Sequence, residues 1–200
     1  MIQAMFVYLE SRSEGIWTFE GERHENVDYD ETDPGDQPVY APIPLYSGVN
    51  PPLQYLFGYQ QRTIIGGTGP AFPTIGIPPD ISAELATWSR VDDLNHGHSW
   101  VSVRELVDFD WYATMGLRQL VTKSIVSYYE HPGTRIRDPG EAILPPVHPD
   151  AQAYPNIYVE LDRHLSYEHA AGSDFMTEVV HRLAYRYGLS EAARIVYWFA

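Results

Sequence analysis

The chain has 200 residues, of which 44% are hydrophobic and 20% charged, the length and composition of one large soluble domain. Its formal net charge of −14 argues against duplex DNA or RNA as a partner, because affinity for nucleic acid comes mainly from Lys and Arg contacts to phosphate. The chain contains no cysteine, which excludes disulfides, thiolate metal ligands and cysteine nucleophiles.

No stretch of the sequence approaches the about 20 consecutive apolar residues that a membrane-spanning helix needs. The segment Met1–Glu10 lacks the basic start of a secretory signal peptide and turns acidic at once. These observations predict a soluble, cytoplasmic protein without a membrane partner.

The N-terminal third of the chain predicts a hairpin followed by a long loop. Alternating apolar residues on both sides of Ser11–Gly15 predict a β-hairpin over residues 5–22. Residues 24–52 are acidic and rich in proline, which blocks regular structure, so we expect a long irregular loop or flap there. A short helix is expected over 53–59, and an apolar step into a glycine-rich turn over 62–70.

The middle of the chain predicts three helices and a strand. Asp80 or Ser82 is expected to cap a helix that runs through residue 88, and residues 99–101 are typical of a strand. Ser102 and Glu105 have the spacing of a capping box, which predicts a helix through about Phe109. Five apolar residues at helical spacing predict an amphipathic helix over 115–129: Leu117, Leu120, Val121, Ile125 and Tyr128.

The C-terminal third completes the predicted fold. Prolines predict a second long loop over 131–155, and a strand is expected over 157–161. Ser173 or Asp174 should begin a helix that Gly188 ends, and the last apolar run predicts a buried strand over 193–199. This order predicts an α+β fold, a single domain over 1–200 whose mixed or antiparallel central sheet contains both ends of the chain.

His96 and His98 are the candidate metal ligands. On an extended segment residues i and i+2 point to the same side, so both imidazoles could meet one ion, zinc being the metal that suits them, with a nearby carboxylate from Asp92 or Asp93. One of four further histidines could complete the site: His148, His164, His169 or His181. The alternative is that one imidazole hydrogen-bonds the backbone and the other is exposed.

Two arginines are candidates for binding an anion. Arg62 precedes the sequence Gly66-Gly67-Thr68-Gly69-Pro70, which lacks the Gly-Lys-Ser/Thr of a P-loop and is interpreted as a turn. Arg104 lies in the first turn of a predicted helix, where a cation opposes the helix dipole unless it faces an acidic neighbour or an anionic ligand. A solvated Arg104 is the alternative.

Four segments together resemble a known family. They are Leu56-Phe57, the turn 76–82 (Gly-Ile-Pro-Pro-Asp-Ile-Ser), the block 98–111 (His-Ser-Trp-Val-Ser-Val-Arg-Glu-Leu-Val-Asp-Phe-Asp-Trp) and the strand 193–199 (Ala-Arg-Ile-Val-Tyr-Trp-Phe). This series resembles a family of small uncharacterised proteins encoded by tailed bacteriophages and prophages. The chain departs from the family pattern at residues 53–55, where Leu-Gln-Tyr replaces Arg-Asn-Tyr, and at its end, which lacks the final Asp-Asn.

The resemblance implies an accessory protein that acts in the cytoplasm of the host cell. We expect non-enzymatic binding of a small anionic ligand such as a nucleotide, and specifically the sequestration of a cyclic nucleotide signal of host immunity. Aromatic rings would stack on the base and cationic groups would hold the phosphate. The expected ligand-binding residues are Tyr59, Arg62, His98, Trp100, Arg104 and Trp111.

Two other functions fit the sequence. One is a metal-dependent hydrolase in which His96 and His98 hold zinc. The other is an inhibitor that docks a host protein through exposed aromatic residues, and a homo-oligomer is compatible with either. Catalysis is the less favoured class, because the sequence has no Gly-x-Ser-x-Gly elbow and no other complete catalytic motif.

Overall fold

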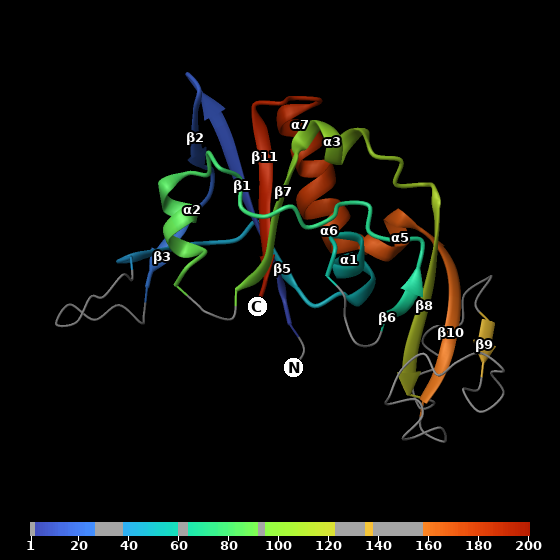
Figure 1. The fold of residues 1–200 in the computed structure, drawn as a ribbon. Coiled ribbons are helices and arrows are strands. Elements are labelled where there is room, and N and C mark those ends of the chain that lie inside the picture. The colour runs from blue at the N-terminus through green and yellow to red at the C-terminus, as the bar shows by residue number, and fades with distance from the viewer. Residues whose placement is uncertain (1–2, 27–37, 60–63, 92–94, 123–134, 138–157) are drawn as a thin grey trace. The chain divides into compact units, whose positions relative to one another are not determined.

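The computed structural model describes residues 3–26, 38–59, 64–91, 95–122, 135–137 and 158–200 (Figure 1). The chain forms two compact units, each assembled from separate stretches of sequence. Unit 1 comprises Met1–Asn50, Phe72–Phe109 and Ser173–Ala200, and unit 2 comprises Pro51–Ala71 and Asp110–Gly172. Antiparallel sheets and short helices confirm the predicted α+β class, whereas a single domain over 1–200 stays a prediction.

The main sheet of unit 1 has the strand order β2-β1-β11-β7, and β5 also pairs with β1. All its pairings are antiparallel, and β1 and β11 lie side by side in the middle. This confirms that the central sheet contains both ends of the chain. Its strands are β1 (Met5–Ser13), β2 (Ile16–Phe19), β5 (Tyr46–Gly48), β7 (His96–Ser102) and β11 (Ala193–Phe199).

Strand β11 is the core of unit 1, because all seven of its residues are buried. Its near-continuous apolar sequence is what a strand covered on both faces requires. Helix α2 (Ala83–Trp88) packs on one face, where Leu85 joins Tyr8, Phe19, Val196 and Trp198 in a buried cluster. Figure 1 shows the C-terminal helices and α3 (Val103–Asp108) on the other side of the sheet.

Local sequence signals account for the hairpin and both caps. The β1–β2 turn places Glu14 and Gly15 at positive φ, 52° and 85°, the backbone of a tight hairpin whose twist suits its strands. Ser82 caps α2 by accepting a hydrogen bond from the Leu85 backbone N–H. Ser102 and Glu105 form both bonds of the predicted capping box at the start of α3.

Residues 24–52 differ from the predicted irregular loop, although residues 27–37 lie outside the described part of the chain. The described residues form β3 (Arg23–Glu25), β4 (Tyr40–Pro42) and β5. Strands β3 and β4 pair antiparallel over only three positions. Proline is compatible with such short strands at their ends and edges, which is why its frequency did not predict them.

The sheet of unit 2 has the strand order β6-β8-β10-β9 and is antiparallel throughout. Its strands are β6 (Ile64–Gly67), β8 (Thr114–Thr122), β9 (Arg135–Arg137) and β10 (Tyr158–Ser166). Helix α1 (Pro51–Leu56) contacts β6 and α5 (Tyr167–Ala171), and α5 contacts β10. The expected helix over 53–59 therefore begins two residues earlier and ends sooner. The rest of the predicted loop 131–155 lies outside the described residues.

The helix predicted over 115–129 is wrong, because residues 114–122 form strand β8. Met115, Leu117, Gln119 and Val121 are buried in alternation, a period of two. Leu120 is buried as well, and its spacing from Leu117 and Val121 produced the apparent helical period. Pairing with the nine residues of β10 decides the outcome, and residues 123–129 lie outside the described part.

The predicted C-terminal helix spans the expected residues but is irregular. It consists of α6 (Ser173–Phe175), the π-helix η3 (Met176–His181) and α7 (Arg182–Tyr187), and it ends at Gly188. A π-helix widens the backbone spiral and rotates the residues that follow it. No helix among the described residues is long and apolar enough to cross a membrane.

Candidate functional site

The two histidines expected to bind metal lie on opposite faces of the sheet. Gly97 has a φ of +61°, and the pairing between β7 and β11 shifts register there, which is a β-bulge with a glycine in the left-handed region. The extra residue reverses the alternation of β7. The His96 ring therefore lies 6.3 Å from the ring of Phe199, whereas His98 lies 5.6 Å from Trp198, the preceding residue of β11.

This arrangement does not bring a metal-ligand set together. Among the described residues no group of three or more His, Cys, Asp or Glu side chains could hold an ion, and Asp92 and Asp93 lie outside them. The His98 imidazole hydrogen-bonds the backbone of Ser89, which is one half of the alternative interpretation, whereas His96 is partly buried and not exposed as that interpretation expected. Its buried Nε2 has no partner in the described part of the chain.

His98 is expected to make folding stability depend on pH. Burial, with a smaller contribution from His96, lowers the pKa of His98 below its ordinary value, so the folded protein takes up a proton here less readily than the unfolded chain. As the pH falls through the ordinary histidine value, the unfolded chain takes up a proton that the folded chain does not, and unfolding becomes easier. The effect of one such group is at most about 1.4 kcal/mol per pH unit.

Urea unfolding of the wild type and of His98→Gln between pH 7.5 and 5 measures this contribution. We expect the free energy of unfolding to fall more steeply towards pH 5 in the wild type than in the variant. Equal slopes would show that His98 does not supply the pH dependence.

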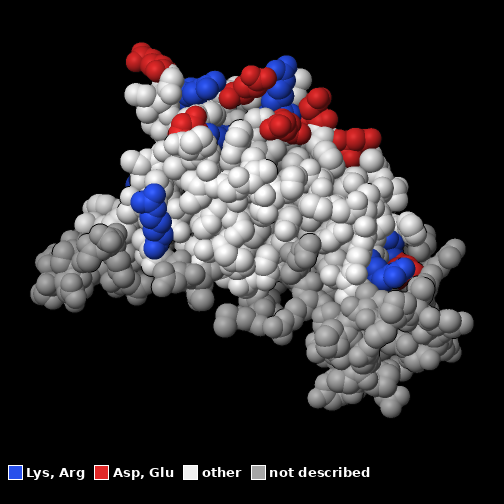
Figure 2. Space-filling view, viewed as in Figure 1, with Lys and Arg blue, Asp and Glu red and all other residues white. Residues whose placement is uncertain are grey.

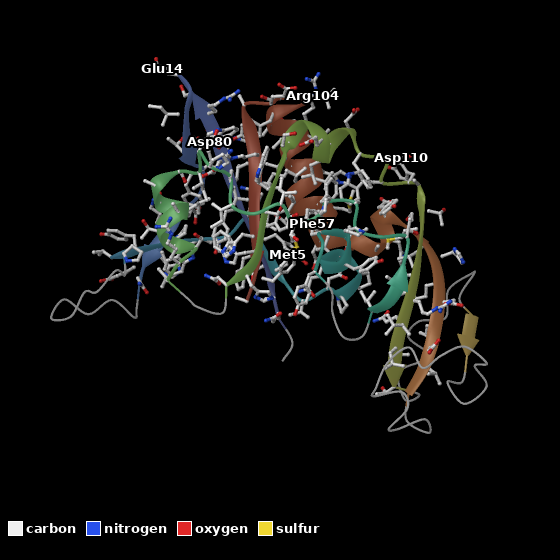
Figure 3. The ribbon with its side chains drawn as sticks, viewed as in Figure 1. Met5, Glu14, Phe57, Asp80, Arg104 and Asp110 are labelled. Atoms are coloured by element: carbon white, nitrogen blue, oxygen red, sulfur yellow. The ribbon has the colours of Figure 1, made fainter. Side chains whose placement is uncertain are left out.

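The residues expected to bind a nucleotide are divided between the two units. Trp100 packs against the buried cluster of unit 1, and the Arg194 guanidinium lies 5.6 Å from its ring centroid. Arg104 pairs with Glu191 at 2.6 Å on the exposed surface, and Figure 3 labels it near the start of α3. Figure 2 shows acidic and basic side chains interspersed along that edge of the molecule. In unit 2, Trp111 is only 5% exposed. Tyr59 is half-buried and Arg62 lies outside the described residues.

A hollow on the sheet of unit 2 is a different candidate, with a volume of about 430 Å³. We call it the glycine pocket, since three of its lining residues have no side chain. It is lined by Gly66, Gly67, Gly116, Leu117, Arg118, Asp162, Arg163 and His164. None of the predicted ligand-binding residues that the structure describes lines it.

Three neighbouring strands build the glycine pocket. In the β8–β10 register Asp162 lies opposite Arg118 and His164 lies opposite Gly116, so all four share one face of the sheet. In β6, Gly66 lies opposite Arg118 beside a bulge. A Cβ built on Gly116 would come 3.8 Å from Cε1 of His164, so the missing side chain is what opens this face.

Arg118 is the cation of the glycine pocket, and Asp162 holds it. The Arg118 Nε donates to Oδ1 of Asp162 at 2.9 Å. This hydrogen bond, followed by the charges of Asp162 and Glu160, raises the pKa of Arg118, so its charge is secure. The pair uses only Nε, and the two terminal nitrogens of Arg118 have no partner among the described residues.

The glycine-rich segment after β6 is held close to β8 by backbone and hydroxyl contacts. Thr68 Oγ1 accepts a hydrogen bond from the Gly116 N–H at 2.8 Å, and the Thr68 N–H donates to the Gly116 carbonyl at 2.9 Å. A Cβ on Gly67 would lie 2.6 Å from that same carbonyl oxygen. Gly67 therefore permits the close approach. The turn predicted over 66–70 is wrong for Gly66 and Gly67, which belong to strand β6, and a bend at Thr68 follows them.

The arrangement suits an oxyanion. A guanidinium that a carboxylate orients through Nε presents its two remaining NH2 groups as a fork, which matches phosphate or carboxylate oxygens. The side chain of Asp162 thereby fixes the direction in which this fork points, on the face that Gly116 leaves open.

Sequence reasoning missed this site for a specific reason. Arg118 and Asp162 are 44 residues apart, and interpreting 115–129 as a helix removed the strand that pairs them. The alternation of Met115, Leu117, Gln119 and Val121 could have indicated that strand. Comparison of the chain with protein-family models, curated proteins and solved structures found no match.

Proposed function

We propose that this protein is a non-enzymatic binding protein that holds a small anionic ligand in the glycine pocket. The observation that carries the proposal is the guanidinium of Arg118. Asp162 orients it through Nε, and its two terminal NH2 groups have no partner among the described residues. His164 on the same face adds a hydrogen-bonding imidazole, and the backbone of Gly116 lets the ligand approach the sheet. Such a site binds by charge and shape and needs no nucleophile.

The ligand class that we propose is a nucleotide. A volume of about 430 Å³ lies within the usual range for small-molecule sites, and a phosphate group is the natural partner of the Arg118 fork. A cyclic nucleotide signal of host immunity, sequestered by a phage accessory protein in the host cytoplasm, is the specific form of this proposal. The resemblance in sequence to phage and prophage proteins supports that setting.

Arg118→Lys tests the site. Lysine keeps the positive charge but loses the fork, so we expect the affinity for adenosine 3′,5′-cyclic monophosphate and for inorganic phosphate to fall about 10-fold or more. Isothermal titration calorimetry with these two probes measures the change. Gly116→Ala should weaken binding of the nucleotide more than binding of phosphate, because the added Cβ narrows the pocket. That Cβ would make ordinary van der Waals contact with His164 and Thr68.

Two further variants make the result decisive. Arg90→Ala removes another exposed arginine and serves as the matched control, since Arg90 does not line the glycine pocket. Arg104→Ala tests the site expected from the sequence. Binding that depends on Arg104 and not on Arg118 would overturn the assignment of the glycine pocket, and a wild type that binds neither probe would overturn the proposal of an anionic ligand.

A further inference from the structure

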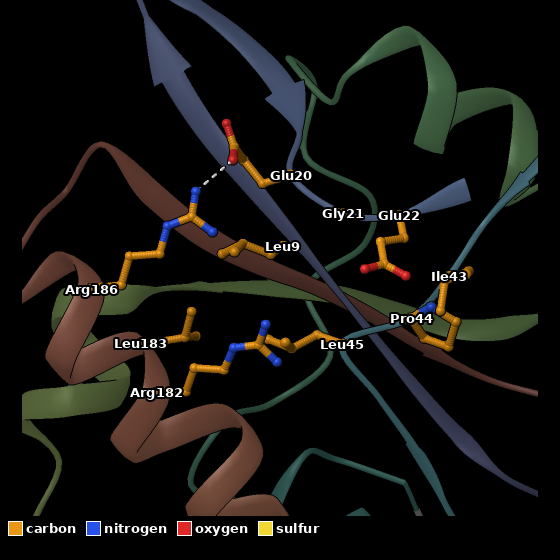
Figure 4. A pocket seen from close by; sticks show the side chains of 10 residues that line it. All are labelled: Leu9, Glu20, Gly21, Glu22, Ile43, Pro44, Leu45, Arg182, Leu183 and Arg186. Carbon is orange, nitrogen blue, oxygen red and sulfur yellow. Dashed lines mark hydrogen bonds and ion pairs between the residues drawn. The ribbon is translucent and has the colours of Figure 1, made fainter. Parts of the chain in front are cut away.

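Unit 1 contains a second hollow, with a volume of about 390 Å³, between the β2–β3 connection and α7. We call it the arginine pocket, after Arg182 and Arg186, which extend from α7. Figure 4 shows these two side chains on one side of the hollow and Glu22 on the other. It differs from the glycine pocket in its unit, its residues and its charge pattern.

The floor of the arginine pocket is apolar. Leu9 of β1 and Leu183 of α7 are buried, and Leu45 lies beside them in the chain that leads to β5. Ile43 closes the side near Glu22 and is partly exposed. A ligand with an aliphatic body would bury apolar surface here, at about 25 cal/mol for each Å² removed from water.

Two of the four charged groups at the rim are already paired. Arg186 donates from a terminal nitrogen to Oε2 of Glu20 at 2.9 Å. The other carboxylate oxygen of Glu20 accepts a hydrogen bond from the Ser11 hydroxyl at 2.6 Å. This pair closes one end of the pocket and leaves little capacity for a ligand.

Arg182 and Glu22 remain open. The Arg182 side chain is 61% exposed, and its one ion pair within the described chain is a 3.9 Å contact to the exposed Glu178, which contributes little. Glu22 has no side-chain partner among the described residues. These opposite charges face one hollow without pairing with each other, so a ligand that carries both charges could bridge them.

The segment that carries Glu22 is fixed in place. A Cβ on Gly21 would come 2.4 Å from the Phe19 ring, so the backbone lies directly over that ring. The Glu22 carbonyl accepts a hydrogen bond from the Ile43 N–H at 2.9 Å. The next residue, Arg23, binds both carboxylate oxygens of Glu84 at 2.6 Å.

The opposite wall is set by the π-helix. Residues Met176–His181 form η3, and α7 begins with Arg182 directly after it. The wider spiral rotates the positions that follow relative to a continuous α-helix, and π-helical turns occur frequently at functional sites. Both walls of the arginine pocket therefore have defined geometry before a ligand arrives.

We propose that the arginine pocket binds a short zwitterionic molecule with an aliphatic body, of which a free dipeptide of aliphatic residues is the simplest example. Arg182 takes the terminal carboxylate through its guanidinium fork, and Glu22 takes the terminal ammonium. The apolar floor takes the side chains between them. This inference does not rest on the proposed function, because it concerns another unit and another ligand class.

Three probes test the charge pattern: leucyl-leucine, its N-acetyl form and its C-terminal amide. Isothermal titration calorimetry of the wild type should detect leucyl-leucine and show about 10-fold weaker binding of each capped form, because each lacks one charge. No binding of leucyl-leucine at millimolar concentration, or equal affinity for all three, would overturn the proposal.

Two variants assign each end of the ligand. Arg182→Ala should lower the affinity for leucyl-leucine to that for its C-terminal amide, so that this variant no longer distinguishes the two ligands. Glu22→Gln should lower the affinity for leucyl-leucine to that for its N-acetyl form. Arg90→Ala, the control, should leave the affinity of leucyl-leucine relative to each capped form unchanged. Both substitutions are at exposed side chains, so folding should be preserved. Discrimination that persists in either variant would contradict the assigned role of that residue.

Discussion

Replacing Arg194 with methionine is expected to lower the free energy of unfolding by about 3–5 kcal/mol, the effect of leaving a buried partner charge alone. Arg194 is 2% exposed and its Nε donates to Oε2 of Glu10, which is fully buried, at 2.7 Å. A terminal nitrogen of Arg194 binds Asp80 at 2.7 Å, and this hydrogen bond lowers the pKa of Asp80. The guanidinium also stacks on Trp17 at 3.9 Å from the ring centroid.

The double variant Glu10→Leu/Arg194→Met separates the charge from the packing. It removes both buried charges, so it should recover much of the stability that the single variant loses, as replacement of buried ion pairs by apolar residues often does. Recovery is incomplete, because Glu10 also accepts a hydrogen bond from the Ser82 N–H at the start of α2. Chemical denaturation of both variants measures the difference. A single variant within about 1 kcal/mol of the wild type would show that the pair is not stabilising.

Trp198→Ala is expected to cost about 3–5 kcal/mol, as for other large aromatic side chains removed from a core. Trp198 is 1% exposed and stacks on Tyr8 with ring centroids 4.4 Å apart. Burial raises the pKa of Tyr8 to about 12, and its hydroxyl accepts a hydrogen bond from the indole N–H of Trp88. Loss of the Trp198 ring removes packing from this whole cluster.

The same variant has a second readout. His98 packs on Trp198, so removing the indole should hydrate the imidazole and raise the pKa of His98 towards its ordinary value. Histidine titration by NMR measures that shift, and denaturation measures the loss of stability. Trp88→Phe is the control, and it should lower the free energy of unfolding less. Trp88 is only partly buried beside the cluster, and phenylalanine keeps an aromatic ring there. A Trp198→Ala protein as stable as this control would contradict the central role of Trp198.

The sequence predicted correctly those elements that depend on interactions between residues close together in the chain. The capping box of Ser102 and Glu105 and the N-terminal hairpin depend on interactions within a few residues, and both are present. The hairpin turn is shorter than the predicted Ser11–Gly15, because β1 continues to Ser13. Strand β11 was predictable because burial on both faces demands a continuous apolar run. Strand β8 was not, because Leu117, Leu120 and Val121 fit both periods and pairing with β10 decided between them.

The candidate sites depend on long-range register, and a single sequence carries little information about that. The expectation that His96 and His98 share a side followed from ideal strand alternation, which the bulge at Gly97 reverses. Arg118 and Asp162 meet only because β8 and β10 pair in one particular register. The glycines near residue 66 were identified as a turn, but their role in opening a sheet face required the neighbouring strands.

The position of β11 between β1 and β7 determines when unit 1 can form during synthesis. A ribosome delivers the chain from its N-terminus, so Met5–Ser13 and His96–Ser102 emerge long before Ala193–Phe199, the strand that joins them. Until Ala193–Phe199 has emerged from the ribosome, β1 and β7 lack the strand that pairs with both of them. Unit 2 takes its strands from residues 64–166 and can close first. We therefore expect the sheet of unit 1 to be completed only when the seven residues of β11 have left the ribosome, after the strands of unit 2 are already available.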